Sequence, residues 1–212
     1  MMGYRHCSQV LYFSFLAILG LTAGTDHSIP DAKEPGKHLL LIQPRNLSAG
    51  VFVLLPGGAR ETTYTAAYQG TIGPRNYQRA EFRKEFPGGW KQFLVKGKKA
   101  ASDHLKTLKP KYIRNSKKVI EYALLESDHP LTATTVMVDE FRDLFKETLG
   151  DQLLIVIPDR FTVYVFPKLA STIGEYQGKF MQLFRDAVYP ASSEIFEVTG
   201  KGLRVFGSFR ED

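Results

Sequence analysis

Two short runs of apolar and β-branched residues, at 153–157 and 162–166, constrain the fold more than any other part of the sequence. They are separated by a Pro-Asp turn that begins at Pro158. Two such runs joined by a short turn predict a β-hairpin. The sequence predicts a second hairpin over 195–209, again with a glycine-containing turn between its strands.

An amphipathic helix is predicted before each hairpin. The first begins at Thr132 or Thr134, whose side-chain oxygen can accept a hydrogen bond from a first-turn amide, and it ends at Gly150. Its apolar face is expected to hold Val136, Met137, Phe141, Leu144 and Phe145. The second helix begins at Ser171 and ends near Tyr189. Its apolar face is expected to hold Ile173, Tyr176, Phe180, Met181, Phe184 and Val188.

The order α-β-β-α-β-β predicts an α+β fold for residues 119–212, with one antiparallel sheet and both helices packed on one face. A β-containing region precedes it at 38–118. Further strands are predicted at 38–43, 51–55, 62–68 and 119–125, and short helices at 75–86 and 100–108.

The first residues have the three parts of a secretory signal peptide. Arg5 gives a basic start, residues 10–23 carry no charge, and small residues end the run. A helix of this length would span roughly 21 Å, which is less than the ~30 Å of a membrane interior. We therefore expect cleavage near Ala23 or Gly24 and no stable membrane span, although a retained anchor stays open. Cleavage would also remove Cys7, the single cysteine.

Charge divides the chain near residue 118. Residues 75–118 hold fourteen Lys or Arg against three acidic residues, whereas residues 119–212 hold nine against fifteen. This contrast predicts a domain boundary. The predicted segments are a signal peptide at 1–24, a linker at 25–37, a basic β-containing region at 38–118 and an α+β region at 119–212.

The C-terminal region carries a recognisable series of motifs. A helix ends in Phe145-Lys-Glu-Thr-Leu-Gly150 and is followed by Asp151-Gln-Leu-Leu-Ile-Val-Ile-Pro-Asp159, a second helix and a closing β pair at 197–209. With its elements in this order, the region resembles the C-terminal part of the YtpQ-like family, a bacterial domain of unknown function. The resemblance covers less than half of the chain. It implies the α+β fold and supplies no catalytic residues.

Residues for nucleophilic or metal chemistry are not grouped in the sequence. Ser48 lies in Asn-Leu-Ser-Ala-Gly, which lacks the first glycine of a nucleophile elbow. The densest candidate pair, Asp128 and His129, is expected to be a solvated loop rather than a pair of metal ligands. Glu126 and Asp159 are interpreted as dispersed surface acids. We therefore expect no catalytic residue, no metal and no cofactor.

A basic stretch interleaved with Trp90, Phe93 and Tyr112 is the candidate contact for a polyanion. Lysine with aromatic residues fits a solvated face, an anionic surface or polymer, or a groove for single-stranded nucleic acid. Nearly all of the charge is lysine, whereas specific phosphate recognition favours arginine, so we expect no specific nucleic acid. The basic residues are Lys91, Lys96, Lys98, Lys99, Lys106, Lys109, Lys111, Arg114, Lys117 and Lys118.

These patterns lead to the hypothesis of an exported, non-catalytic binding or structural protein of the cell envelope, periplasmic or extracellular. The alternative is an envelope hydrolase with a loop-built site near Asp128/His129 and Asp159/Arg160. An enzyme should have a pocket in which a base and an electrophile-stabilising group converge. A binding protein should instead expose a broad apolar or basic patch.

Overall fold

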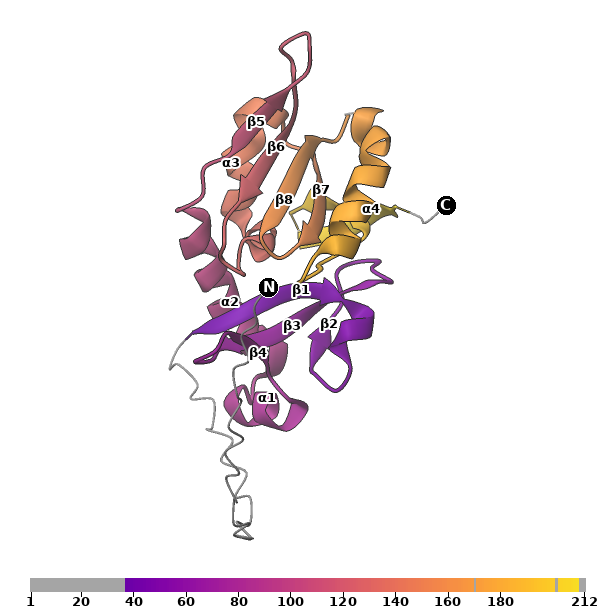
Figure 1. The fold of residues 1–212 in the computed structure, drawn as a ribbon. Coiled ribbons are helices and arrows are strands. Elements are labelled where there is room, and N and C mark those ends of the chain that lie inside the picture. Colours follow the sequence, from indigo (N-terminus) through magenta and orange to yellow (C-terminus); the bar gives the residue numbers. More distant parts are fainter. Residues whose placement is uncertain (1–36, 170, 201, 210–212) are drawn as a thin grey trace, which may run out of the picture. The chain divides into compact units, whose positions relative to one another are not determined.

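The computed structural model describes residues 37–169, 171–200 and 202–209. The predicted signal peptide and, apart from Lys37, the predicted linker lie outside these residues. The described part of the chain contains two antiparallel sheets with four helices (Figure 1).

The larger sheet contains both predicted hairpins and has six strands, all of them antiparallel to their neighbours. In spatial order the strands are β10 (Gly202–Ser208), β9 (Glu194–Thr199), β7 (Leu153–Asp159), β8 (Thr162–Pro167), β6 (Ile120–Glu126) and β5 (Lys111–Arg114). The hairpin predicted around Pro158 is β7–β8, and the second is β9–β10. The predicted α+β class and the order of the C-terminal elements are confirmed.

Both C-terminal helices start later than the sequence predicts, because a 3-10 helix precedes each of them. Helix α3 (Asp139–Leu149) follows η2 (Ala133–Met137). Helix α4 (Gln177–Asp186) follows η3 (Ser171–Tyr176).

The predicted helix starts at Thr132, Thr134 and Ser171 are therefore wrong. The hydroxyls of Thr132 and Thr134 donate to backbone carbonyls three residues earlier, at 2.8 and 3.0 Å, instead of accepting from first-turn amides. Such local bonds compete with helix capping. The predicted end of α3 is confirmed, because Gly150 has a φ of 90°, a conformation that favours glycine.

The six-stranded sheet is covered on both faces. Ile155 packs in one buried cluster with Phe145 of α3, whereas its neighbour Leu154 packs in a second cluster with Phe180 of α4. In Figure 1, α4 lies in front of the sheet and α3 behind it. The two helices therefore lie on opposite faces rather than on one. Burial of both faces explains why the central strands are continuously apolar instead of alternating.

The smaller sheet is centred on β3, which pairs with its three other strands. Its strands are β1 (His38–Pro44), β2 (Val53–Leu54), β3 (Thr62–Gln69) and β4 (Pro74–Asn76), with the 3-10 helix η1 (Arg45–Ser48) after β1.

Two helices cover one face of the smaller sheet. They are α1 (Arg79–Glu85) and α2 (Gly89–Leu105), so the helix predicted over 100–108 starts much earlier. Phe93 and Ala101 belong to a stripe of buried residues that recur at every fourth position along α2. At Gly97 in the same stripe, an added Cβ would lie 3.1 Å from the Cβ of Leu40, so helix and sheet approach closely there.

The two sheets share one buried cluster that includes Leu40 and Phe93 as well as Ile155 and Phe196. The described residues form one compact unit. Strand β5 lies before the predicted boundary at residue 118 and pairs with β6 after it; the boundary itself stays a prediction. None of the described helices has the length and apolarity needed to cross a membrane.

Substitution of neighbouring residues in α3 tests this packing. Phe145 is fully buried, whereas Leu144, which the sequence places on the same apolar face, is 38% exposed. We expect Phe145→Ala to lower the free energy of unfolding by about 3–5 kcal/mol and Leu144→Ala to lower it by less than about 1 kcal/mol. Urea unfolding measures both, and equal losses would contradict this placement of α3.

Candidate functional site

Backbone hydrogen bonds join the loop after β6 to the turn between β7 and β8. The amide of Ser127 donates to the carbonyl of Phe161 at 3.1 Å, and the amide of Ala133 donates to the carbonyl of Arg160 at 3.0 Å. The amide of Arg160 donates to the carbonyl of Tyr189 at 3.2 Å. Three segments that are distant in sequence are therefore held together at one place.

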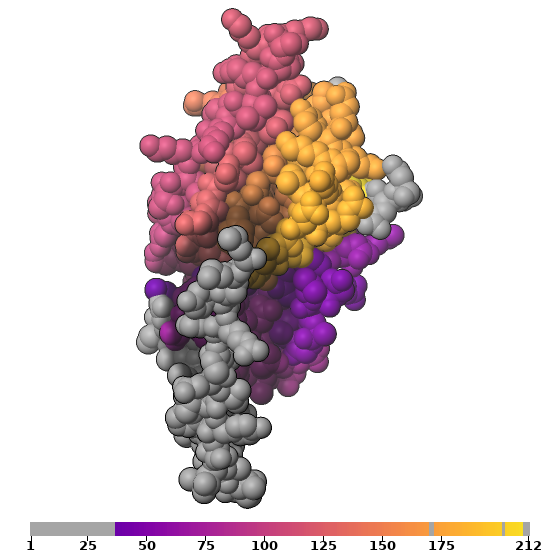
Figure 2. All heavy atoms as spheres, viewed as in Figure 1, coloured from indigo at the N-terminus to yellow at the C-terminus, as the bar shows by residue number. Residues whose placement is uncertain are grey.

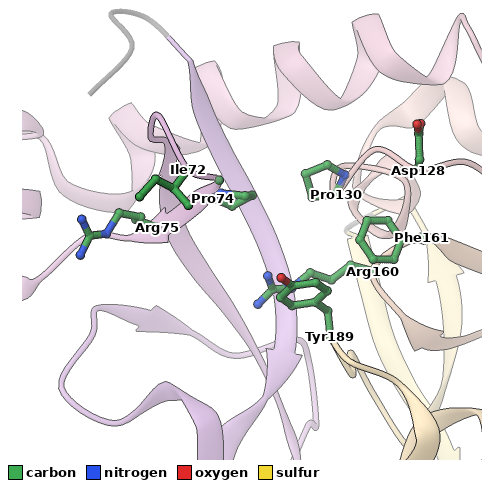
Figure 3. A pocket seen from close by; sticks show the side chains of 9 residues that line it. Ile72, Pro74, Arg75, Asp128, Pro130, Arg160, Phe161 and Tyr189 are labelled. Atoms are coloured by element: carbon green, nitrogen blue, oxygen red, sulfur yellow. The ribbon is translucent and has the colours of Figure 1, made fainter. Parts of the chain in front are cut away.

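A cavity of about 510 Å³ lies at this junction (Figure 3). The turn between β3 and β4 supplies one wall through Ile72 and Pro74, and Pro130, Phe161 and Tyr189 supply apolar surface on the other side. Two further cavities, of about 530 and 480 Å³, adjoin the same loop after β6. The loop that contains Asp128 and His129 is thus surrounded by concave surface.

Arg160 brings a positive charge to the first cavity. A terminal nitrogen donates to Oε1 of Gln43 at 3.1 Å, and the guanidinium carbon lies 5.2 Å from the centre of the Tyr189 ring. Its Nε is buried without a hydrogen-bond partner, and among the described residues no carboxylate forms an ion pair with it. Burial lowers the pKa of Arg160 because it disfavours the charged form, although a guanidinium stays protonated at neutral pH.

The acidic residues near Arg160 do not neutralise it. Asp128 lines the same cavity, but its carboxylate points away from the guanidinium in Figure 3, as does the side chain of Arg75. The carboxylate of Asp159 accepts the amide of Phe161 at 2.7 Å within its own turn. Burial raises the pKa of Asp159 because it penalises the ionised form.

His129 belongs to a pair of histidines that the sequence did not predict. Its ring centre lies 4.4 Å from that of His104, at the end of α2. Nε2 of His104 lies 3.1 Å from the Thr132 hydroxyl, and Nδ1 of His129 accepts the amide of Leu131 at 3.2 Å. The two histidines are far apart in sequence and only the tertiary fold brings them together, so no local pattern reveals the pair.

The pKa values of both histidines lie below the ordinary value. Desolvation is the main cause for each, and His129 further lowers the pKa of His104, while Lys37 lowers that of His129. Asp128 acts in the opposite direction on both. Each ring is therefore held in its neutral form over a wider pH range than a free histidine.

Ser48, the nearest approach to a nucleophile in the sequence, has a structural role. Its hydroxyl lies 2.7 Å from that of Thr63 and accepts a hydrogen bond from Gln43 at 2.9 Å. Across the ranges that the structure covers, no group of three His, Cys, Asp or Glu side chains is placed to hold a metal ion.

The basic stretch is divided between exposed cations and buried aromatic side chains. Phe93 is fully buried, and Trp90 packs on it with its indole nitrogen buried. These aromatic rings stabilise the core and are not exposed between the lysines as in a single-strand groove. Tyr112 is half-buried.

The cations themselves are spread along α2, the connection to β5 and the β5–β6 hairpin. The tip of that hairpin projects from the surface in Figure 2, at the opposite end from the start of α2 in Figure 1. Lys99 and Lys106 pair with Asp103, and Lys111 pairs with Glu126. Contact with a polyanion through these residues stays a prediction.

Comparison with known proteins adds no assignment: the chain matches no protein-family model, no curated protein and no solved structure. The resemblance to the YtpQ-like family therefore stays a prediction.

The histidine pair predicts how stability depends on pH. In the unfolded chain each histidine binds a proton near pH 6.5, whereas in the folded protein protonation requires a lower pH. As the pH falls below about 6.5, the unfolded state binds more protons, so these groups lower the free energy of unfolding.

We expect the double variant His104→Asn/His129→Gln to lose less stability than the unsubstituted protein between pH 7 and pH 5. Urea unfolding at several pH values measures this difference, and the other titrating groups are common to both proteins. An identical pH dependence in the two proteins would contradict the lowered pKa values of the two histidines.

Proposed function

We propose that the chain is an exported, non-catalytic binding protein of the cell envelope, and that the cavity at Arg160 is its ligand site. Export is inferred from the signal-peptide pattern of residues 1–24, which N-terminal sequencing of the secreted protein tests. The same proposal retains the YtpQ-like character of residues 119–212, which supplies a fold and no reaction.

One observation carries the binding proposal: Arg160 lines a concave, mostly apolar site, and the carboxylate of Asp128, which also lines it, points away from this cation. Ligand sites are commonly pockets of about 300–1,000 Å³ with apolar walls and a few polar groups that fix orientation. The rim adds exposed apolar surface, because Ile72 is 92% exposed and Tyr189 is 48% exposed. Exposed apolar residues around a pocket favour contact with a ligand over a purely structural role.

An envelope hydrolase at the same loops is the competing proposal. The observation that favours a hydrolase is that Asp128 and Arg160 line one cavity. A hydrolytic site needs a base that faces the same reacting atoms as the stabilising cation. The carboxylate of Asp128 instead points away from Arg160, and His129 lines an adjoining cavity, so binding without turnover is the better-supported function.

The basic stretch supports a second contact, with an anionic surface or polymer. Lys91, Lys109 and Lys117 are exposed, and no ion pair occupies them within the described ranges. We expect the protein to elute from heparin at a higher salt concentration than its Lys91→Gln/Lys109→Gln/Lys117→Gln variant, since such binding depends on charge and is screened by salt. Elution of both proteins at the same salt concentration would remove this contact from the proposal.

Binding at the cavity is tested with the neutral fluorescent probe phenylnaphthylamine. Ile72 lies on an exposed turn, so Ile72→Asp should leave the fold intact while it removes apolar contact with the probe. We expect the dissociation constant to rise about tenfold, the equivalent of about 1.4 kcal/mol.

Leu169→Asp is the matched control, because Leu169 is 94% exposed and does not line the cavity. It should bind the probe as the unsubstituted protein does. Equal affinity for the two variants, or no binding by the unsubstituted protein, would contradict the assignment of the cavity as a ligand site.

A further inference from the structure

We propose that the ligand of this cavity is an amphipathic anion, whose anionic oxygens pair with the guanidinium of Arg160 and whose apolar body lies against the walls. The inference rests on the proposed function, since it specifies the chemical class of ligand for the same site.

The charge of Arg160 is partly buried and is not compensated by the described residues. Its contacts are the amide oxygen of Gln43 at 3.1 Å and the ring of Tyr189 at 5.2 Å, and both groups are uncharged. A buried charge without a counter-ion destabilises a protein. A ligand anion would supply the missing counter-charge, so the arrangement favours binding at some cost to the stability of the free protein.

The geometry also holds the guanidinium ready for an anion. The backbone of Arg160 is held by hydrogen bonds with the carbonyl of Tyr189 and the amide of Ala133, and its guanidinium is held by Gln43 and by the ring of Tyr189. The guanidinium has five N–H donors in a planar fork, and one of its terminal nitrogens makes a hydrogen bond within the described chain. A fixed fork with free donors matches the two oxygens of a carboxylate.

The rest of the cavity selects for an apolar body. Ile72, Pro74, Pro130 and Phe161 contribute no charged group, and the side chains of Asp128 and Arg75 point away from Arg160 in Figure 3. A small hydrophilic anion such as acetate would leave these walls in contact with water. A medium-chain carboxylate would cover the walls and neutralise Arg160 together.

Two dyes of similar shape separate charge from apolar contact. Anilinonaphthalene sulfonate carries an anionic group, whereas phenylnaphthylamine is neutral. We expect the protein to bind the anionic dye at least tenfold more tightly than the neutral dye, and decanoate to displace the anionic dye at lower concentration than decanol or acetate.

Arg160→Gln should weaken binding of the anionic dye at least tenfold and leave binding of the neutral dye unchanged. Arg83→Gln is the matched control, because it removes an exposed guanidinium of α1 with the same change in net charge and does not line the cavity. If Arg160 has no counter-ion in the free protein, Arg160→Gln should leave the melting temperature unchanged or raise it.

Gln43→Glu is a second test that keeps Arg160 in place. It introduces a carboxylate at the atom that already accepts a hydrogen bond from the guanidinium at 3.1 Å. This internal counter-ion should compete with the ligand and weaken binding of the anionic dye at least tenfold.

The outcomes distinguish the two proposals. If the unsubstituted protein binds neither dye, the proposed function fails. If it binds both dyes equally, and neither Arg160→Gln nor Gln43→Glu changes the affinity for either dye, the cavity remains a ligand site but the inference of an anion is wrong. If Arg160→Gln unfolds the protein, Arg160 is structural, and unchanged dye binding by Gln43→Glu then overturns the inference.

Discussion

The peptide groups on either side of Arg160 are hydrogen-bonded to two other parts of the chain, and the arrangement of the candidate site depends on these bonds. The amide of Arg160 donates to the carbonyl of Tyr189, and the amide of Ala133 donates to the carbonyl of Arg160. The turn between β7 and β8 is thereby fixed to the loop after β6 and to the segment after α4. These bonds hold together three segments whose side chains line the cavity.

The two sheets give this junction its rigidity. The six-stranded sheet is buried on both faces by α3 and α4, so its turns extend from a packed scaffold. The four-stranded sheet is attached through the hydroxyls of Thr62 and Ser192, which lie 2.6 Å apart, and through the contact of Gln43 with Arg160. A binding site at the junction of two sheets is therefore formed by side chains whose backbones are held independently of any ligand. Such preorganisation lowers the entropic cost of binding.

The sequence predicted the hairpins well because apolar runs and turn residues are local signals. It predicted the helix starts poorly, because the hydroxyls of Thr132 and Thr134 bond to nearby carbonyls in a buried 3-10 turn, a competition that depends on tertiary packing. The opposite placement of α3 and α4 was encoded in the continuous apolar character of 153–157, which indicates a strand buried on both faces. The pairing of His104 with His129 arises only when the end of α2 meets a loop of the other sheet. Arg160 was considered beside Asp159, whereas its contacts in the structure come from Gln43 and Tyr189, which are distant in sequence.

Arg160 has no carboxylate counter-ion among the described residues, and we propose that an anionic ligand supplies one. The proton–nitrogen correlation spectrum of the arginine side chains reports on the surroundings of each guanidinium. The Nε–H of Arg160 is buried without a hydrogen-bond partner, so its signal should respond to an anion that binds the same guanidinium. Addition of decanoate should shift the Arg160 signal to a saturating value and leave the Arg83 signal in place, and the same concentration of decanol should shift the Arg160 signal much less. An Arg160 signal that stays unchanged while decanoate binds elsewhere on the protein would contradict the assignment of Arg160 as the anion site.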